Sequence, residues 1–159
     1  GKLDKINSFS NKNTKVFMAI GDYKVRKSIY LETSVNKFDH ISIIHPSAII
    51  DDSSKIGVSN FIGPFSNIGP NVSIGSFNVI NTYCDIEHES IIGDFNDISP
   101  GTMIMGRCKI GNQTFIGANV TIINNISIND ENIIGAGAVI TKNILTKGKT
   151  YVGIPGKAL

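Results

Sequence analysis

An isoleucine stands at every sixth residue from Ile44 to Ile140, without a single insertion or gap. The row fills 17 consecutive slots and contains most of the 29 isoleucines of the chain. A period of six matches neither the 3.6-residue period of an α-helix nor the simple alternation of a long strand. Because β-branched side chains favour strands, the repeat predicts short strands separated by corners, each presenting one isoleucine to a common interior.

The other positions of the hexad agree with this interpretation. With isoleucine as position 1, glycine occupies position 2 in eight repeats, where we expect it to supply the backbone angles of a tight corner. Four of the five prolines fall at position 3, in a turn where proline removes no ladder hydrogen bond. Position 5 is uncharged and mostly small, and it shares a strand face with the next isoleucine. Three hexads complete a triangular coil, so residues 44–140 predict a parallel β-helix of about 5.7 coils, about 27 Å long at ~4.8 Å per coil.

The two ends of the chain lie outside the repeat. In residues 1–43 we expect a strand at 16–20, a helix at 23–31 and a strand at 38–44, which together form a partial βαβ segment. This segment contains no complete GxGxxG motif for a dinucleotide. Residues 141–159 carry four lysines and no acid, whereas residues 44–140 carry nine acids and three bases. The basic tail is either a solvated end or a contact for phosphate groups.

Composition excludes several classes of protein. A net charge of +2 argues against binding of nucleic acid through bulk charge. Two long uncharged stretches, 56–84 and 110–129, are rich in proline or polar residues, so neither is expected to span a membrane, and a cytoplasmic location is the default. Cys84 and Cys108 form neither a disulfide framework nor a metal-binding spacing, and we expect them to be buried free thiols on different faces.

One hexad departs from the rule. It reads IEHESI. Glu87 takes position 2, which is glycine in eight other repeats, and His88 and Glu89 follow it at the corner. Between residues 85 and 97 there are five acids and no base. A corner histidine is exposed, so His88 is predicted either to act as a general base with a carboxylate orienting its ring, or to be an ordinary surface or interface histidine.

Four stretches carry a family resemblance: INTYCDIEHESIIGDFNDISPGTMIMG, IGNQTFIGANVTI, IGAGAVITKNI and YVGIPGKAL. They resemble the left-handed β-helix acyltransferases, and most of all the sialic-acid O-acetyltransferases and bacillosamine-type amino-sugar N-acetyltransferases, over residues 16–159. The resemblance implies an all-β left-handed parallel β-helix with a partial N-terminal α/β segment that binds substrate. It also implies a homotrimer that binds acetyl-CoA between subunits, with no resident metal.

The resemblance also assigns the acceptor site. His88 matches the family's catalytic base, Glu89 matches the acid beside it, and Asn81 matches an asparagine that lines the acceptor site. Asp97 stands where the family usually has a second histidine at the thioester or the site wall, and we assign it to the substrate site. The family's first strand and Gly-rich nucleotide loop have no counterpart here, so we expect the chain to begin partway into the N-terminal domain.

The same resemblance assigns a path for the cosubstrate. Gly106, Ala118 and Ala136 match main-chain positions that contact the pantetheine arm, where small side chains let a thin arm approach. Lys142, and Lys157 in the GIPGK segment, match the end of the cofactor groove and are predicted to contact phosphate.

Three functions fit these residues, and a fourth is excluded. The first is transfer of an acetyl group from acetyl-CoA to the amine of a nucleotide-linked amino-sugar in bacterial surface-glycan biosynthesis, which the acidic residues around His88 favour. The second is O-acetylation of sialic acid or a related sugar, and the third is a silent β-helix scaffold. A γ-carbonic-anhydrase-like metal prism is rejected, because it needs three histidine ligands and only His88 stands at a mid-prism corner.

Overall fold

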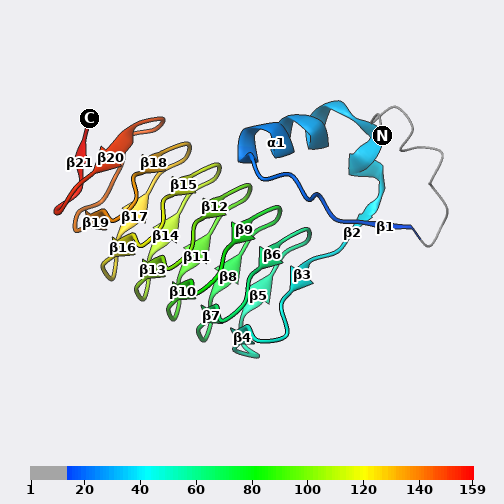
Figure 1. Cartoon of the computed structure of the whole chain (residues 1–159), viewed down its shortest axis with the longest axis horizontal. Coiled ribbons are helices and arrows are strands. Elements are labelled where there is room, and N and C mark those ends of the chain that lie inside the picture. The colour runs from blue at the N-terminus through cyan, green and yellow to red at the C-terminus, as the bar shows by residue number, and fades with distance from the viewer. Residues whose placement is uncertain (1–13) are drawn as a thin grey trace.

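The computed structural model describes residues 14–159, so residues 1–13 of the predicted N-terminal segment lie outside the described part. Figure 1 shows a prism of stacked triangular coils, with the helix α1 (Tyr23–Glu32) lying along one of its long sides. The predicted fold class, a parallel β-helix preceded by a partial α/β segment, is confirmed.

Three parallel sheets form the faces of the prism. The first, called sheet B, contains β3 (Ile43–Ile44), β6 (Phe61–Ile62), β9 (Val79–Ile80), β12 (Asp97–Ile98), β15 (Phe115–Ile116), β18 (Ile133–Ile134), β20 (Thr150–Val152) and the antiparallel β21 (Lys157–Ala158). Sheet C contains β4 (Ile49–Ile50), β7 (Asn67–Ile68), β10 (Asp85–Ile86), β13 (Met103–Ile104), β16 (Thr121–Ile122) and β19 (Val139–Ile140). Sheet D contains β5 (Lys55–Ile56), β8 (Ser73–Ile74), β11 (Ile91–Ile92), β14 (Lys109–Ile110) and β17 (Ser127–Ile128).

Corners join these sheets in three columns, which we name by their contents. The alanine edge, between sheets B and C, consists of residues 45–47, 63–65, 81–83, 99–101, 117–119 and 135–137. The histidine edge, between sheets C and D, consists of residues 51–53, 69–71, 87–89, 105–107, 123–125 and 141–143. The helix edge, between sheets D and B, consists of residues 57–59, 75–77, 93–95, 111–113 and 129–131.

The isoleucine row forms the core, except at one end. From Ile62 to Ile140 every isoleucine of the row is at most 3% exposed, because it stacks between equivalent side chains of adjacent coils. Ile44 at the first coil is 44% exposed, because no preceding coil covers it within the described residues. Cys84 and Cys108 are buried and free, on sheets C and D as predicted, and burial raises the pKa of the Cys84 thiol to about 11.

The reason predicted for the glycines at position 2 is wrong. Left-handed backbone occurs instead at position 4, at residues such as Phe65 (φ 57°) and Asn71 (φ 57°), whereas none of the position-2 glycines has a positive φ. Glycine is needed at position 2 because the next coil lies so close. A methyl group on Gly57, for example, would lie 2.5 Å from the carbonyl oxygen of Gly75.

The coil also continues beyond Ile140, where the sixfold register stops. Ile144 forms a parallel bridge with Ile128, and Tyr151 of β20 pairs with Ile134. These spacings are 16 and 17 residues instead of 18. Residues 141–159 therefore complete and close the last coil in addition to forming a basic tail.

The N-terminal segment has the predicted strand–helix–strand order with shorter strands. β1 (Lys15–Val16) pairs in parallel with β2 (Asp39–His40), and α1 and a 3₁₀ turn, η2 (Ser34–Lys37), connect them. The predicted strand at 38–44 is in fact two strands, β2 and β3, in different sheets. The helix begins at Tyr23 and is capped by Asp22, whose carboxylate accepts hydrogen bonds from the first-turn N–H groups of Lys24 and Val25.

Candidate active site

His88 and Glu89 are in direct contact at the third corner of the histidine edge. The Nδ1 atom of His88 lies 3.0 Å from Oε2 of Glu89. A carboxylate at this distance favours the tautomer with its proton on Nδ1, which leaves the lone pair on Nε2. Both side chains are nearly half exposed, at 43% and 48%, so an external acceptor has access to the pair.

The next coil shapes the space around the imidazole. A methyl group on Gly106 would lie 2.5 Å from Nε2 of His88, so the ring rests directly on the main chain of Gly106. Any larger residue at position 106 has to displace the ring. The sequence marked Gly106 as a contact for the pantetheine arm, and the structure places it against the proposed base itself.

Arg107 was missed by the sequence reasoning. Its guanidinium Nη2 lies 2.9 Å from Oε2 of Glu89, the same oxygen that faces His88. The hydrogen bond with His88 and that with Arg107, in this order, lower the pKa of the Glu89 carboxyl, so Glu89 stays ionised around neutral pH. The eighteen-residue coil length could have revealed this contact, because Arg107 stands one coil after Glu89.

Asn81 lies on the alanine edge, not on the histidine edge. Its Oδ1 accepts a hydrogen bond of 2.8 Å from the backbone N–H of Thr82. This bond fixes the orientation of the amide and uses its acceptor, so the Nδ2 group is presented as a donor. Such a donor suits a carbonyl or hydroxyl oxygen of a substrate.

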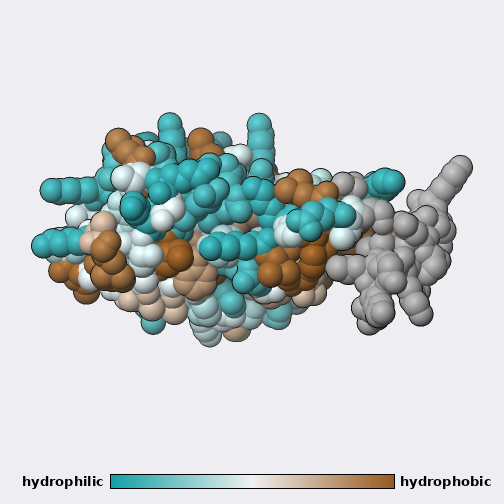
Figure 2. Space-filling view, turned by 90° about the horizontal axis from the view of Figure 1, so that it is seen from above, coloured by the Kyte–Doolittle hydropathy of each residue, from teal (hydrophilic) through white to brown (hydrophobic). Residues whose placement is uncertain are grey.

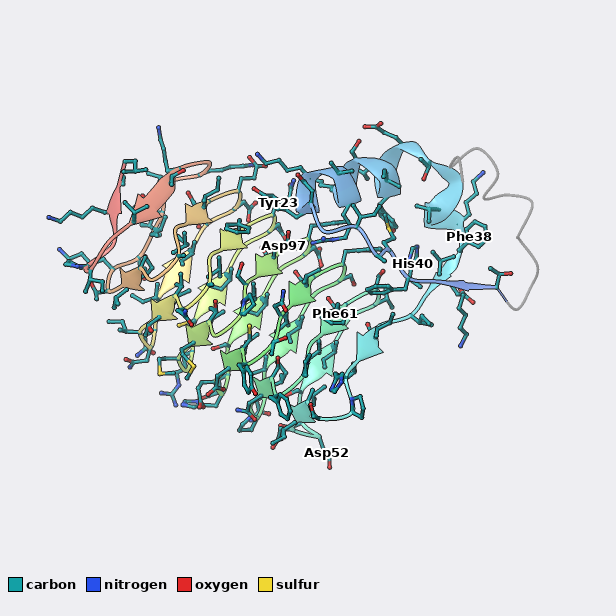
Figure 3. The ribbon with its side chains drawn as sticks, in the orientation of Figure 1. Tyr23, Phe38, His40, Asp52, Phe61 and Asp97 are labelled. Carbon is teal, nitrogen blue, oxygen red and sulfur yellow. The ribbon has the colours of Figure 1, made fainter. Side chains whose placement is uncertain are left out.

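Asp97 projects from sheet B toward the N-terminal segment, as Figure 3 shows where it lies beside Tyr23 under α1. Its Oδ1 pairs with Nη2 of Arg26 at 2.6 Å. Arg26 is 1% exposed, and its Nε, Nη1 and Nη2 atoms also donate to main-chain oxygens of the helix edge, of Asn96 and of the turn before α1. Burial raises the pKa of Asp97 in spite of the opposing pull of Arg26. In this chain Asp97 therefore anchors the N-terminal segment to the prism, a role that the sequence did not indicate.

The predicted cofactor residues divide between the two edges. Ala118 and Ala136 stand in successive coils of the alanine edge, and Gly156 near the end of the chain donates its N–H to the oxygen of Val139 just beyond that edge. Lys157 follows in β21 and is exposed. The two corners form a strip of small residues, called here the Ala118–Ala136 strip. It has room for a thin arm such as pantetheine, because Ala136 and Gly137 are exposed and a methyl group on Gly137 would meet nothing within 4 Å.

Lys142 lies instead on the histidine edge, at the same hexad position as His88 and three coils further on. The coil spacing of a sheet puts it about 14 Å along the prism from the histidine. Within one chain, the histidine edge thus holds His88, Glu89, Gly106 and Lys142, and the alanine edge holds Asn81, Ala118 and Ala136, with Lys157 beyond its end.

The helix edge forms a separate hollow. Its shallow pocket of about 300 Å³ is lined by residues of α1 and of three coils, including Lys27, Gln113, Glu131 and Lys147. Figure 2 looks onto the side that carries α1, which is covered mainly by hydrophilic side chains with scattered hydrophobic patches. His88 does not line this pocket, because it stands on the histidine edge.

Two further properties concern only the described residues 14–159. None of their helices is long and apolar enough to cross a membrane. None of their histidine, cysteine, aspartate and glutamate side chains gather in a group of three or more that could hold a metal ion.

Comparison with known proteins supports the repeat and the fold. Residues 107–142 match the family described as bacterial transferase hexapeptide (six repeats). The repeat of this chain therefore resembles that of the hexapeptide-repeat transferases over this stretch, and its fold is a parallel β-helix. The resemblance to hexapeptide-repeat acyltransferases inferred from the sequence is thereby confirmed. No curated protein matches its sequence.

Several solved structures share the fold of this chain. WeeI from Acinetobacter baumannii AYE is 28% identical, with a TM-score of 0.87 over 94% of this chain and 73% of its own. The acetyltransferase domain of PglB from Neisseria gonorrhoeae FA1090, in complex with acetyl coenzyme A, is 26% identical, with a TM-score of 0.93 over 100% of this chain and 77% of its own. PerB from Caulobacter crescentus, in complex with CoA and GDP-perosamine, is 24% identical, with a TM-score of 0.91 over 99% of this chain and 74% of its own, and it supports the fold alone.

Proposed function

We propose that this protein transfers the acetyl group of acetyl-CoA to the amine of a nucleotide-linked amino-sugar in bacterial surface-glycan biosynthesis. The observation that carries the proposal is the His88–Glu89 pair, which is exposed, oriented through Nδ1 and seated on Gly106. The neighbour that contains acetyl coenzyme A, 26% identical over the whole chain, supports the donor.

In the proposed reaction the amine nitrogen attacks the thioester carbonyl carbon. A C–N bond forms while Nε2 of His88 accepts the proton from the amine, and Glu89 stabilises the resulting imidazolium. A backbone N–H, such as that of Gly106, stabilises the oxyanion. The C–S bond then breaks, and the departing thiolate takes the proton from His88 to give free CoA and the amide.

The division of the predicted residues between two edges supports an oligomer with shared sites. If the alanine edge of one subunit faces the histidine edge of another, a cosubstrate lying along the Ala118–Ala136 strip can present its thioester to His88. A cyclic trimer forms such a heterologous contact and closes on itself. We therefore propose a homotrimer in which each site takes one edge from each of two subunits.

An amine acceptor is preferred over a hydroxyl for two reasons. Glu89 is paired with Arg107, but Asp85 and Glu87 add two further negative charges within three residues of His88, which favours a cationic amino-sugar. Perosamine N-acetyltransferase, another fold neighbour, is named for acylation of an amine. A cytoplasmic location stays a prediction from the sequence.

An acceptor panel tests the proposal. The protein is mixed with acetyl-CoA and with nucleotide-linked amino-sugars, their hydroxyl counterparts or sialic acid, and free CoA thiol and the mass of the product are followed. We expect thiol release and an N-acetylated product with an amino-sugar only. Release with sialic acid or a hydroxyl sugar alone would establish the O-acetyltransferase alternative, and absence of both turnover and calorimetric acetyl-CoA binding would establish a silent scaffold.

A further inference from the structure

Arg107 makes two contacts with the proposed catalytic pair. Its guanidinium Nη2 lies 2.9 Å from Oε2 of Glu89, and its backbone N–H donates to the carbonyl oxygen of His88 over 2.9 Å. Glu89 and Arg107 both have left-handed backbone, with φ values of 59° and 62°. Because they occupy equivalent positions in consecutive coils, their side chains leave the corner from the same backbone conformation.

Glu89 needs such a second contact. It is 48% exposed, and a free glutamate side chain loses substantial rotamer entropy when it is held in one position. The single hydrogen bond to His88 competes with water for this carboxylate. Arg107 binds the same oxygen and so restricts Glu89 to the rotamer that meets Nδ1 of His88.

We propose that Arg107 is a positioning residue of the histidine edge, which fixes Glu89 against His88 so that Nε2 faces the acceptor. This inference rests on the proposed function and extends it to a residue that does not touch the substrate. The ion pair is exposed on both sides, at 59% and 48%, so it adds little to the stability of the fold. Its effect lies in the orientation of the pair.

A competing role for Arg107 is direct binding of the donor's phosphates. The two roles differ in the kinetic constant that they change. A positioning residue lowers kcat and acts through Glu89, whereas a phosphate contact raises the KM for acetyl-CoA and is independent of Glu89.

The kinetic experiment compares Arg107→Gln, Arg107→Lys, Glu89→Gln and the double variant Glu89→Gln/Arg107→Gln. We expect Arg107→Gln to lower kcat about tenfold at unchanged KM for acetyl-CoA, because the imidazole loses its alignment. Lysine should restore part of the rate. In the Glu89→Gln background the arginine substitution should change kcat less than about twofold, because the two residues act as one unit. Lys109→Gln, an exposed base two residues further on, is the matched control and should leave kcat and KM unchanged.

A second measurement does not depend on activity. Titration of the Glu89 carboxyl by ¹³C NMR should show a higher pKa in Arg107→Gln than in the parent protein, because one of the two interactions that lower it is lost. If the parent protein transfers no acetyl group, the proposed function is rejected, and the titration still decides whether Arg107 holds Glu89. An unchanged Glu89 titration, or a raised KM at unchanged kcat, overturns the positioning role.

Discussion

The histidine edge and the alanine edge are built from the same hexad but present opposite surfaces. At the third and fourth coils the histidine edge exposes ionisable groups, with His88, Glu89 and Arg107 in mutual contact. At the fifth and sixth coils the alanine edge carries no ionisable side chain: Asn119, Ala136 and Gly137 are exposed, and Ala118 is half-buried. In Figure 3, Asp52 marks the first corner of the histidine edge, on the side of the prism away from α1.

The difference shows how a strict repeat makes room for function. The inward positions 1 and 5 are fixed by stacking, so substitutions that serve chemistry are confined to the corners. A corner can then carry either reactive groups or almost no side chain at all. In the proposed trimer the two kinds of corner complement each other. The histidine edge of one subunit supplies the general base, and the alanine edge of another leaves room for the pantetheine arm of acetyl-CoA.

The largest expected effect comes from removing the imidazole of the histidine edge. His88→Ala should lower kcat by about two to four orders of magnitude, the usual range for loss of a general base. Release of CoA thiol with the best acceptor measures this. His45→Ala is the matched control, because His45 is an exposed corner histidine of the alanine edge whose ring is hydrogen-bonded to Ser47, and its rate should equal that of the parent. A parental rate in His88→Ala would show that the histidine edge is not the catalytic one.

A single methyl group should also disturb the histidine edge. Gly106→Ala places a carbon 2.5 Å from Nε2 of His88 and has to move the ring, so kcat should fall about 100-fold while the circular dichroism spectrum is retained. Gly21→Ala is the control, since a methyl group there meets nothing within 4 Å. Unchanged turnover in Gly106→Ala would mean that His88 works in a different position.

Mixed trimers test whether the two edges work together. His88→Ala and Ala136→Trp should each be inactive alone, the first for lack of a base and the second because the indole blocks the strip. Co-assembled at equal amounts, they should recover about a quarter of the parental turnover, since that share of the contacts pairs two intact edges. Mixing after assembly without subunit exchange is the control. No recovery on co-assembly would indicate that each site belongs to one chain.

The smallest effect on catalysis is expected on sheet B, away from both edges. Asp97→Ala leaves the buried Arg26 without its anion, and we expect α1 to lose about 3 kcal/mol of protection in hydrogen exchange. The KM for the acceptor should stay the same. A strong rise in this KM with unchanged protection of α1 would instead support the substrate-binding role predicted from the sequence.

Much of the fold could be predicted because its signal is local. A branched apolar residue at every sixth position is compatible with few structures other than a β-helix, and Ile62 to Ile140 are buried as this pattern requires. The closing coil was missed because Ile144 and Tyr151 enter the core at irregular spacings. The reason for the position-2 glycines was missed because the close approach involves a segment eighteen residues away.

The candidate site was predictable in its residue types but not in its contacts. The sequence alone determined the repeat, the core, and the corner at which Glu87, His88 and Glu89 replace the usual pattern, since these follow from periodicity. Only the tertiary structure decided that Asp97 pairs with Arg26, 71 residues earlier, and that Arg107 shares an oxygen of Glu89 with His88. The eighteen-residue coil brings Arg107 next to Glu89, but which side-chain atoms pair there depends on the tertiary structure. Where the N-terminal segment docks on the prism is encoded by no local pattern of the sequence.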